Sequence, residues 1–274
     1  MAAKGDSRSI LKTTLAVPLF IIAALFALWP LGTSSEPRDH ADTLFNTWLV
    51  SWNNHAILHL ENPLKQPAFA GFEDGQGRND LLLTQSMVAL PLHLSGMKPI
   101  LIHNILMVFF LALAGYAAAL LAVQCGAKTA GAVFTGTAVA LLPWFQSHIW
   151  HLQLFSGGLG LMALFFAMRT SQGKSKGWQT AFFILLQCLA SLYMWFFMNM
   201  ALLLFLPFTE KKGFLKTAAW TAAGNLICLP FLLRHFSNAA SWPVDTITST
   251  DAAAFPAPWG NSLFMGWMRY SGVH

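Results

Sequence analysis

Charged residues are scarce in this chain. Only 10% of its 274 residues are Asp, Glu, Lys or Arg, whereas 55% are hydrophobic and the mean hydropathy is +0.53. Soluble domains carry about a quarter of their residues as charges, so this shortage excludes an ordinary soluble protein. The formal net charge of +5 comes from small basic clusters between apolar runs, as the positive-inside rule expects. The composition predicts a polytopic protein embedded in a lipid bilayer, with no nucleic-acid partner.

Cysteine is also scarce, with three residues in the whole chain. Cys125, Cys188 and Cys228 each lie in or beside an apolar run, and none belongs to a C-x-x-C pair. This pattern is typical of small packing residues and not of disulfides or metal ligands.

What the chain has in abundance is long apolar stretches, and we predict an all-α fold with about seven membrane spans. Several are shorter than the roughly twenty residues that a perpendicular helix needs. The predicted spans are residues 15–29, 99–124, 129–146, 152–169, 178–194, 195–209 and 217–234. The tight turn between the fifth and sixth is expected at residues 193–198, and residues 81–98, which contain Pro91, are expected to form a partial or re-entrant element.

The distribution of charge predicts which side each loop occupies. With seven spans, the inner connections carry a set of basic residues: Lys4, Arg8, Lys12, Lys128, Arg169, Lys174, Lys176, Lys211, Lys212 and Lys216. All acidic residues except Asp6 and Glu210 then fall outside. We therefore expect a multi-pass protein of the inner membrane with a cytoplasmic N-terminus. The first span also resembles a signal peptide, but no small-x-small cleavage site follows it.

Two units follow from this topology. Residues 1–234 form the transmembrane domain, which includes a large external loop at residues 33–80. Residues 235–274 form a second external segment, rich in Trp and Pro, and we expect it to lead into a missing C-terminal part.

The first external loop contains an amphipathic segment from His40 to Leu60. Its apolar residues recur at spacings of three and four, which predicts a helix in the membrane interface. At about 100° per residue, one stripe contains Asp42, Asn46 and Asn53, and another contains Trp48, Trp52, His55 and His59. The first stripe could hold a hydroxylated ligand or a metal-bound phosphate, or it could be the solvated face.

Two smaller groups carry candidate chemistry. Asp39 and Asp42 are three residues apart, which suits a divalent cation or a general base. His148 and His151 have the same spacing in the outer turn between two spans, and could bind metal or phosphate, or belong to an interfacial aromatic belt. The predicted topology places the aspartate pair and the histidine pair on the same outer face of the membrane.

The order of these elements resembles a known family. Asp42, Asn46, Trp48, Trp52 and His55 are followed by Asn62-Pro63, Asn79-Asp80, Asn104 and the turn His151-Leu152-Gln153. This order is similar to that of the large bacterial membrane proteins of the glycosyltransferase C type, in particular the protein mannosyltransferase group.

The resemblance implies an enzyme that uses a polyprenyl-phosphate sugar donor and a hydroxyl acceptor, with its active site under the first external loop. Asp42 matches the acidic residue that acts as the base or helps to hold a divalent cation, and Asp39 is its nearest partner. Together with the residues named above from the sequence pattern, the candidate substrate-binding residues are Asn46, Trp52, His55, Asp80, His148, His151, Gln153 and Arg234. Members of the family are longer than this chain, which again implies a C-terminal truncation.

The predicted reaction is an inverting sugar transfer, in which Asp42, before Asp39, takes the proton of the acceptor hydroxyl. His148, His151, Arg38, Arg78 and Arg234 are candidates to stabilise the departing phosphate, although Arg234 could simply snorkel. Two other classes stay open. A transporter should place ionisable residues near the bilayer midplane, and a non-catalytic lipid-binding protein would not need Asp42.

Overall fold

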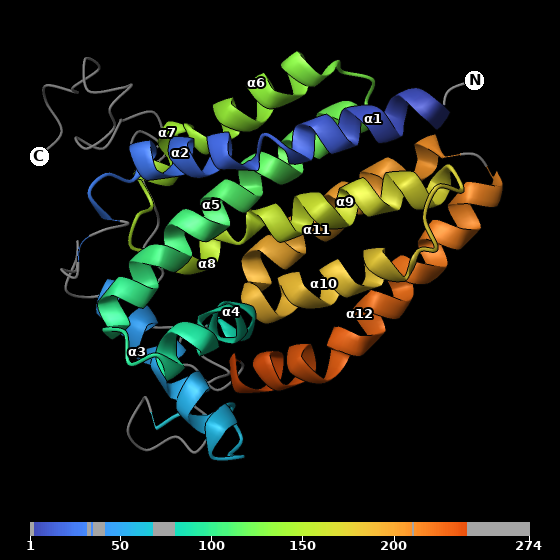
Figure 1. The fold of residues 1–274 in the computed structure, drawn as a ribbon. Coiled ribbons are helices and arrows are strands. Elements are labelled where there is room, and N and C mark those ends of the chain that lie inside the picture. The colour runs from blue at the N-terminus through green and yellow to red at the C-terminus, as the bar shows by residue number, and fades with distance from the viewer. Residues whose placement is uncertain (1–2, 32–33, 35–41, 68–79, 210, 240–274) are drawn as a thin grey trace, which may run out of the picture.

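The computed structural model describes residues 3–31, 34, 42–67, 80–209 and 211–239. Within these ranges the chain forms helices and no strand, which confirms the all-α class (Figure 1). The helices are α1 Ala3–Thr14, α2 Val17–Ala27, α3 Asp42–Leu58, α4 Leu83–Leu94, α5 Pro99–Gln124, α6 Thr129–Ala140, α7 Pro143–Gln146, α8 Leu152–Phe155, α9 Gly157–Ser171, α10 Trp178–Ala190, α11 Leu192–Phe205 and α12 Lys211–Ala239.

The described residues form three clusters of buried apolar side chains, and helix α5 is the centre of the first. It packs against α2, α6 and α9, and Leu106, Met107 and Phe110 are fully buried. Small residues let the backbones approach, because a Cβ added at Gly158 of α9 would lie 2.7 Å from the Ala114 nitrogen of α5. Close packing at small residues is typical of helices in membranes, where no hydrophobic effect drives helices together.

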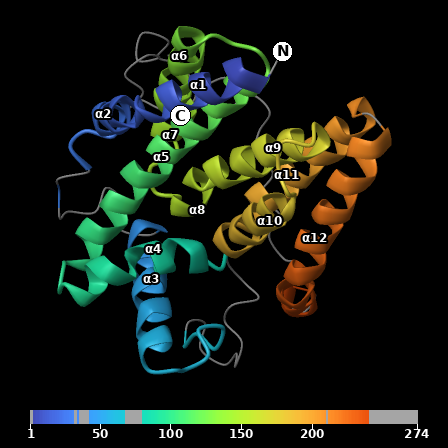
Figure 2. The same ribbon diagram turned by 45° about the vertical axis from the view of Figure 1, so that its right-hand side comes forward.

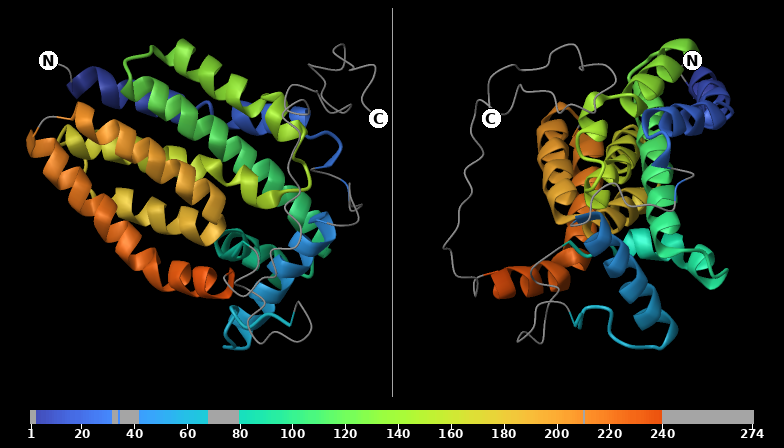
Figure 3. Two further views of the ribbon diagram at one scale, coloured as in Figure 1. Left: turned by 180° about the vertical axis from the view of Figure 1, so that it is seen from behind. Right: turned by 90° about the vertical axis from the view of Figure 1, so that its left-hand side faces the viewer.

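A second core lies among α9, α10, α11 and α12, which Figure 3 shows side by side. Cys188 and Cys228 are both fully buried in it, which confirms their predicted packing role. Cys125 differs, because it is exposed at the C-terminal end of α5.

In the part of the chain that the structure describes, three helical stretches are long and apolar enough to cross a membrane: Ser9–Ala27, Pro99–Gln124 and Leu152–Ser171. Trp178–Ala190 and Leu192–Phe208 are shorter apolar helices. The protein is therefore a helical protein suited to a membrane, and the number of seven spans stays a prediction.

The helix ends separate into two groups. Figure 1 shows the N-terminal end of α1, the α5–α6 and α9–α10 connections and the start of α12 at one end of the bundle. This end carries Lys128, Lys174, Lys176 and Lys216. The opposite end carries α3, α4, α7, α8 and the α10–α11 turn. Lys65 and Lys98 lie at this opposite end, next to α3 and the start of α5. The membrane side that each end faces stays a prediction.

The turn between α10 and α11 lies at Ser191, so its predicted place at residues 193–198 is wrong. Ser191 alone is extended, and its hydroxyl oxygen accepts a hydrogen bond from the Met194 backbone nitrogen as a helix N-cap. The reason for the error is that residues 192–198 are uniformly apolar or aromatic, whereas the local stop signal is one serine.

Helices α3 and α4 lie across the second end of the bundle, and α3 crosses the direction of α5 at a steep angle (Figure 2). Helix α4 contains Pro91 and packs against α3, α5 and α10. Its first turn supports the α10–α11 turn, since Thr84 donates to the Leu186 carbonyl at 2.7 Å and Gln85 to the Ala190 carbonyl at 3.2 Å. Gln85 thus binds a carbonyl group that the end of α10 leaves without a helical partner, and Thr84 adds a bond to a carbonyl one turn earlier.

Candidate functional site

Helix α3 places two different sets of side chains on two faces. Asn46 and Asn53 are buried, with 5% and 0% of their surface exposed. Asn53 donates to the Leu81 carbonyl at 2.9 Å and to the Ser86 hydroxyl at 3.1 Å. This stripe is therefore not a solvated face: its carboxamides attach α3 to the rest of the protein.

The other face of α3 carries a row of rings that stack on one another. The ring centroids of Trp48 and Trp52 are 6.4 Å apart, those of Trp52 and His55 are 5.9 Å apart, and those of His55 and His59 are 4.1 Å apart. Trp48, His55 and His59 are exposed. Indole rings on an exposed helix face suit the interface between hydrocarbon and water.

The turn between α7 and α8 brings the second group of candidate residues to α3. Asn46 donates to the Trp150 carbonyl at 3.0 Å and to the Gln153 side-chain oxygen at 3.3 Å, across 104 and 107 residues of sequence. Farther from α3, Gln187 accepts from the Gly160 backbone nitrogen and donates to Ser156, both at 2.9 Å. Hydrogen bonds from α3 thus hold residues 150–153, and hydrogen bonds from α10 hold the junction of α8 and α9 that follows.

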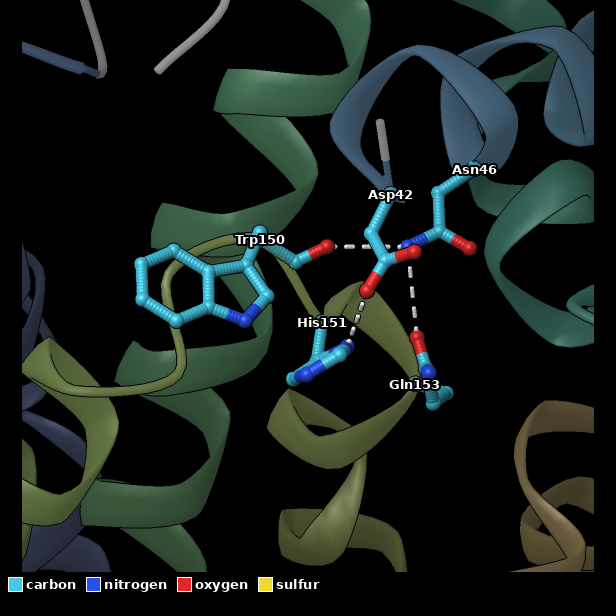
Figure 4. A network of polar contacts seen from close by, with 5 residues as sticks. All are labelled: Asp42, Asn46, Trp150, His151 and Gln153. Carbon is cyan, nitrogen blue, oxygen red and sulfur yellow. Dashed lines mark hydrogen bonds and ion pairs between the residues drawn. The ribbon is translucent and has the colours of Figure 1, made fainter. Parts of the chain in front are cut away.

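The central contact of the site joins Asp42 and His151. Oδ2 of Asp42 lies 3.2 Å from Nδ1 of His151 (Figure 4). Their side chains are 51% and 29% exposed, so the pair is open to a ligand from the solvent side. Asp42 is also in the first turn of α3, where the helix dipole favours a negative charge.

His148 lies beside this pair. Its ring centroid is 6.1 Å from that of His151 and 4.6 Å from that of Trp144. Nδ1 of His148 is 2.8 Å from the Trp144 carbonyl oxygen, which places a proton on Nδ1. Nε2 of His148 is then the ring atom suited to accept a proton or, when protonated, to bind an anion.

Asp80, predicted to bind substrate, caps a helix in the structure. Its Oδ1 accepts a hydrogen bond of 2.8 Å from the Leu192 backbone nitrogen, at the start of α11. Burial raises the pKa of Asp80 from 3.8 to about 6, although the hydrogen bonds from Leu192 and Ser191 act in the opposite direction. Ser191 between two apolar runs is a sequence signal for the start of a helix. No feature of the sequence near Ser191 indicates that Asp80 would bind there.

The remaining candidates lie elsewhere. Trp52 and His55 follow Asp42 by ten and thirteen residues on the same helix, which places them about 15 and 20 Å from it along the axis. Arg234 is on α12, whose main contacts are with α9 and α10. Asp39, Arg38 and Arg78 lie outside the described residues. The structure thus brings together Asp42, Asn46, His148, His151 and Gln153.

The described residues contain no group of three or more His, Cys, Asp or Glu side chains that could hold a metal ion. Whether a divalent cation binds near Asp42 stays open, because Asp39, its predicted partner, lies outside the described residues.

Comparison of the chain with protein-family models, curated proteins and solved structures finds no match. The arguments about function therefore depend on the site and on the sequence pattern.

Proposed function

We propose that this protein is a membrane glycosyltransferase that moves a sugar from a polyprenyl-phosphate donor to a hydroxyl acceptor at the extracytoplasmic face, with inversion at the anomeric carbon. The observation that carries the proposal is the contact between Asp42 and His151, on elements remote in sequence and at the end of the bundle opposite Lys128, Lys174, Lys176 and Lys216. A carboxylate paired with imidazole, next to apolar helices, suits a substrate with a polar head and a lipid tail. The order of residues that resembles the glycosyltransferase C type supports the same reaction.

In the proposed reaction, Asp42 takes the proton from the acceptor hydroxyl as its oxygen attacks the anomeric carbon. The bond between that carbon and the phosphate oxygen breaks, and the phosphate leaves with the electron pair. His151 orients the Asp42 carboxylate through Nδ1. His148, whose Nδ1 donates to the Trp144 carbonyl, can donate from Nε2 to the departing phosphate when its ring is protonated.

The direct test is transfer by the full chain in lipid vesicles. The donor is a polyprenyl-phosphate hexose labelled in the sugar, and the assay measures label on hydroxyl acceptors from cell-envelope extract together with released polyprenyl phosphate. Asp42→Asn should lower the rate by about 10²- to 10⁴-fold, as expected for the loss of a general base. Glu61→Gln is the matched control, since Glu61 is an exposed acid beyond the other end of α3.

The same variants separate catalysis from folding. Because the Asp42–His151 pair is half exposed, its loss should cost below about 1 kcal/mol of stability. Unchanged transfer by Asp42→Asn removes the proposed base, and an equal loss in Glu61→Gln shows that the effect is not specific. Donor binding without any release of polyprenyl phosphate by the wild-type chain would favour a non-catalytic lipid-binding protein, and movement of intact donor across the vesicle membrane would favour a transporter.

A further inference from the structure

A groove of about 380 Å³ lies between α2 and α5. It is lined by three residues between Val17 and Leu25 and by six between Ile105 and Tyr116, and all of these side chains are apolar apart from the Tyr116 hydroxyl. Its volume is in the range of ligand pockets, about 300–1,000 Å³. A pocket without polar groups cannot orient a polar ligand, so the chemistry of the lining selects a hydrocarbon chain.

A polar pair lies at the Tyr116 end of the groove. The Thr14 hydroxyl and the Tyr116 hydroxyl are 3.0 Å apart and hydrogen bonded, so the one polar atom in the lining is used within the protein. At the sides, Ile21 and Phe109 are 42% and 45% exposed. The groove is therefore accessible from the protein surface at Ile21 and Phe109, and its lining ends at Val17 and Tyr116.

The position of the groove along α2 fits one leaflet of a bilayer. Trp29, 67% exposed just after α2, suits the membrane–water interface, where Trp is enriched. At about 1.5 Å per residue, the groove begins about 6 Å below Trp29, at Leu25, and ends about 18 Å below it, at Val17. Half of a hydrocarbon core of about 30 Å is about 15 Å. Both helical stretches that form the groove are also long enough to span a membrane.

We propose that this groove is a binding site for one acyl chain of a membrane phospholipid, taken from the leaflet at the Trp29 end. The chain enters sideways from the bilayer, between Ile21 and Phe109, and its methyl end stops at the Thr14–Tyr116 hydrogen bond. The length of the groove distinguishes a phospholipid acyl chain from a longer polyprenyl chain. A chain that exceeds one leaflet would have to continue past the Thr14–Tyr116 pair. The site is independent of the proposed sugar transfer.

Two neighbouring isoleucines provide a matched test. Ile21 lines the groove, whereas Ile22 is 61% exposed and is not part of the lining. The full chain is placed in vesicles of phosphatidylethanolamine and phosphatidylglycerol that contain a trace of phosphatidylethanolamine with a diazirine in one acyl chain. After illumination, mass spectrometry locates and counts the labelled residues. Phe134 on α6, 75% exposed, reports ordinary contact with bulk lipid.

Labelling should concentrate on Phe109 and the other groove residues and exceed that of Phe134. Ile21→Trp should lower groove labelling by about tenfold, because an indole in the groove displaces about two methylene groups of the chain. Ile22→Trp should leave groove labelling unchanged. Leu25→Trp blocks the mouth of the groove and replaces Ile21→Trp if that variant does not insert into membranes.

Three results would overturn the assignment. Equal labelling of the groove and Phe134 would mean bulk lipid only. Equal labelling in the Ile21→Trp and Ile22→Trp variants would place the bound chain elsewhere. Displacement of the probe by polyprenyl phosphate at a lower concentration than by phospholipid would make a polyprenyl tail the occupant.

Discussion

Replacement of Asn46 by alanine should detach the turn that carries His151 from α3. Asn46 makes two hydrogen bonds, at 3.0 Å to the Trp150 carbonyl and at 3.3 Å to Gln153, and its side chain is 5% exposed. Each such bond contributes about 1 kcal/mol net, so we expect a loss of about 2 kcal/mol. In a protein of this size, that loss lowers the apparent melting temperature by about 4–8 °C.

Asn53 provides the control for this prediction. It lies on the same face of α3, is 0% exposed, and also makes two hydrogen bonds, at 2.9 and 3.1 Å. Asn53→Ala should therefore cost about as much stability as Asn46→Ala. Its partners, Leu81 and Ser86, are at the opposite end of the face from His151, so the Asp42–His151 contact should persist.

The geometry of that contact can be measured without any assumption about activity. Asp42 and His151 are both replaced by cysteine, in a chain whose three native cysteines are alanine, and the rate of cross-linking by a short bifunctional thiol reagent is followed. Asn46→Ala should slow cross-linking, and Asn53→Ala should not, although both variants are less stable. Equal slowing in both, or no slowing in either, would refute the role of Asn46 as the specific link between α3 and the turn.

Two further outcomes follow from Asp80 and from the α5–α6 contact. Because burial raises the pKa of Asp80 from 3.8 to about 6, its ionisation opposes folding, and stability should fall as the pH rises from about 4 through about 6. Asp80→Asn keeps an acceptor for Leu192 and removes an ionisation cost of at most about 3 kcal/mol. Thermal unfolding should therefore show the variant to be more stable than the wild type at pH 7.5, but not at pH 4. An unchanged stability at pH 7.5 contradicts this account. Gly136→Ala should destabilise the fold by about 1–3 kcal/mol, because the new methyl group would collide with the Gly115 carbonyl, whereas Gly131→Ala on the open side of α6 should be neutral or better in the same assay.

The properties that could be predicted from the sequence are those that each segment carries locally. Apolar run lengths and the scarcity of charge indicate membrane helices, and lysines next to the helix ends indicate one face of the bundle. The spacing of three and four in α3 correctly separates Asn46 and Asn53 from Trp48 and Trp52, because a helix repeats its faces every 3.6 residues whatever it packs against.

The roles of individual polar residues depend instead on what each helix meets. Asp80 looks like a loop acid until α11 begins beside it, and Asn46 looks like part of a ligand-binding stripe until Trp150 and Gln153 occupy its amide. The sequence pattern predicts His55 and His151 on the same outer side. In the structure His151 contacts Asp42 at the start of α3, whereas His55 is near the end of that helix. Hydrogen-bond partners more than a hundred residues apart are set by the packing of whole helices, and helix packing leaves no periodic signal in either segment.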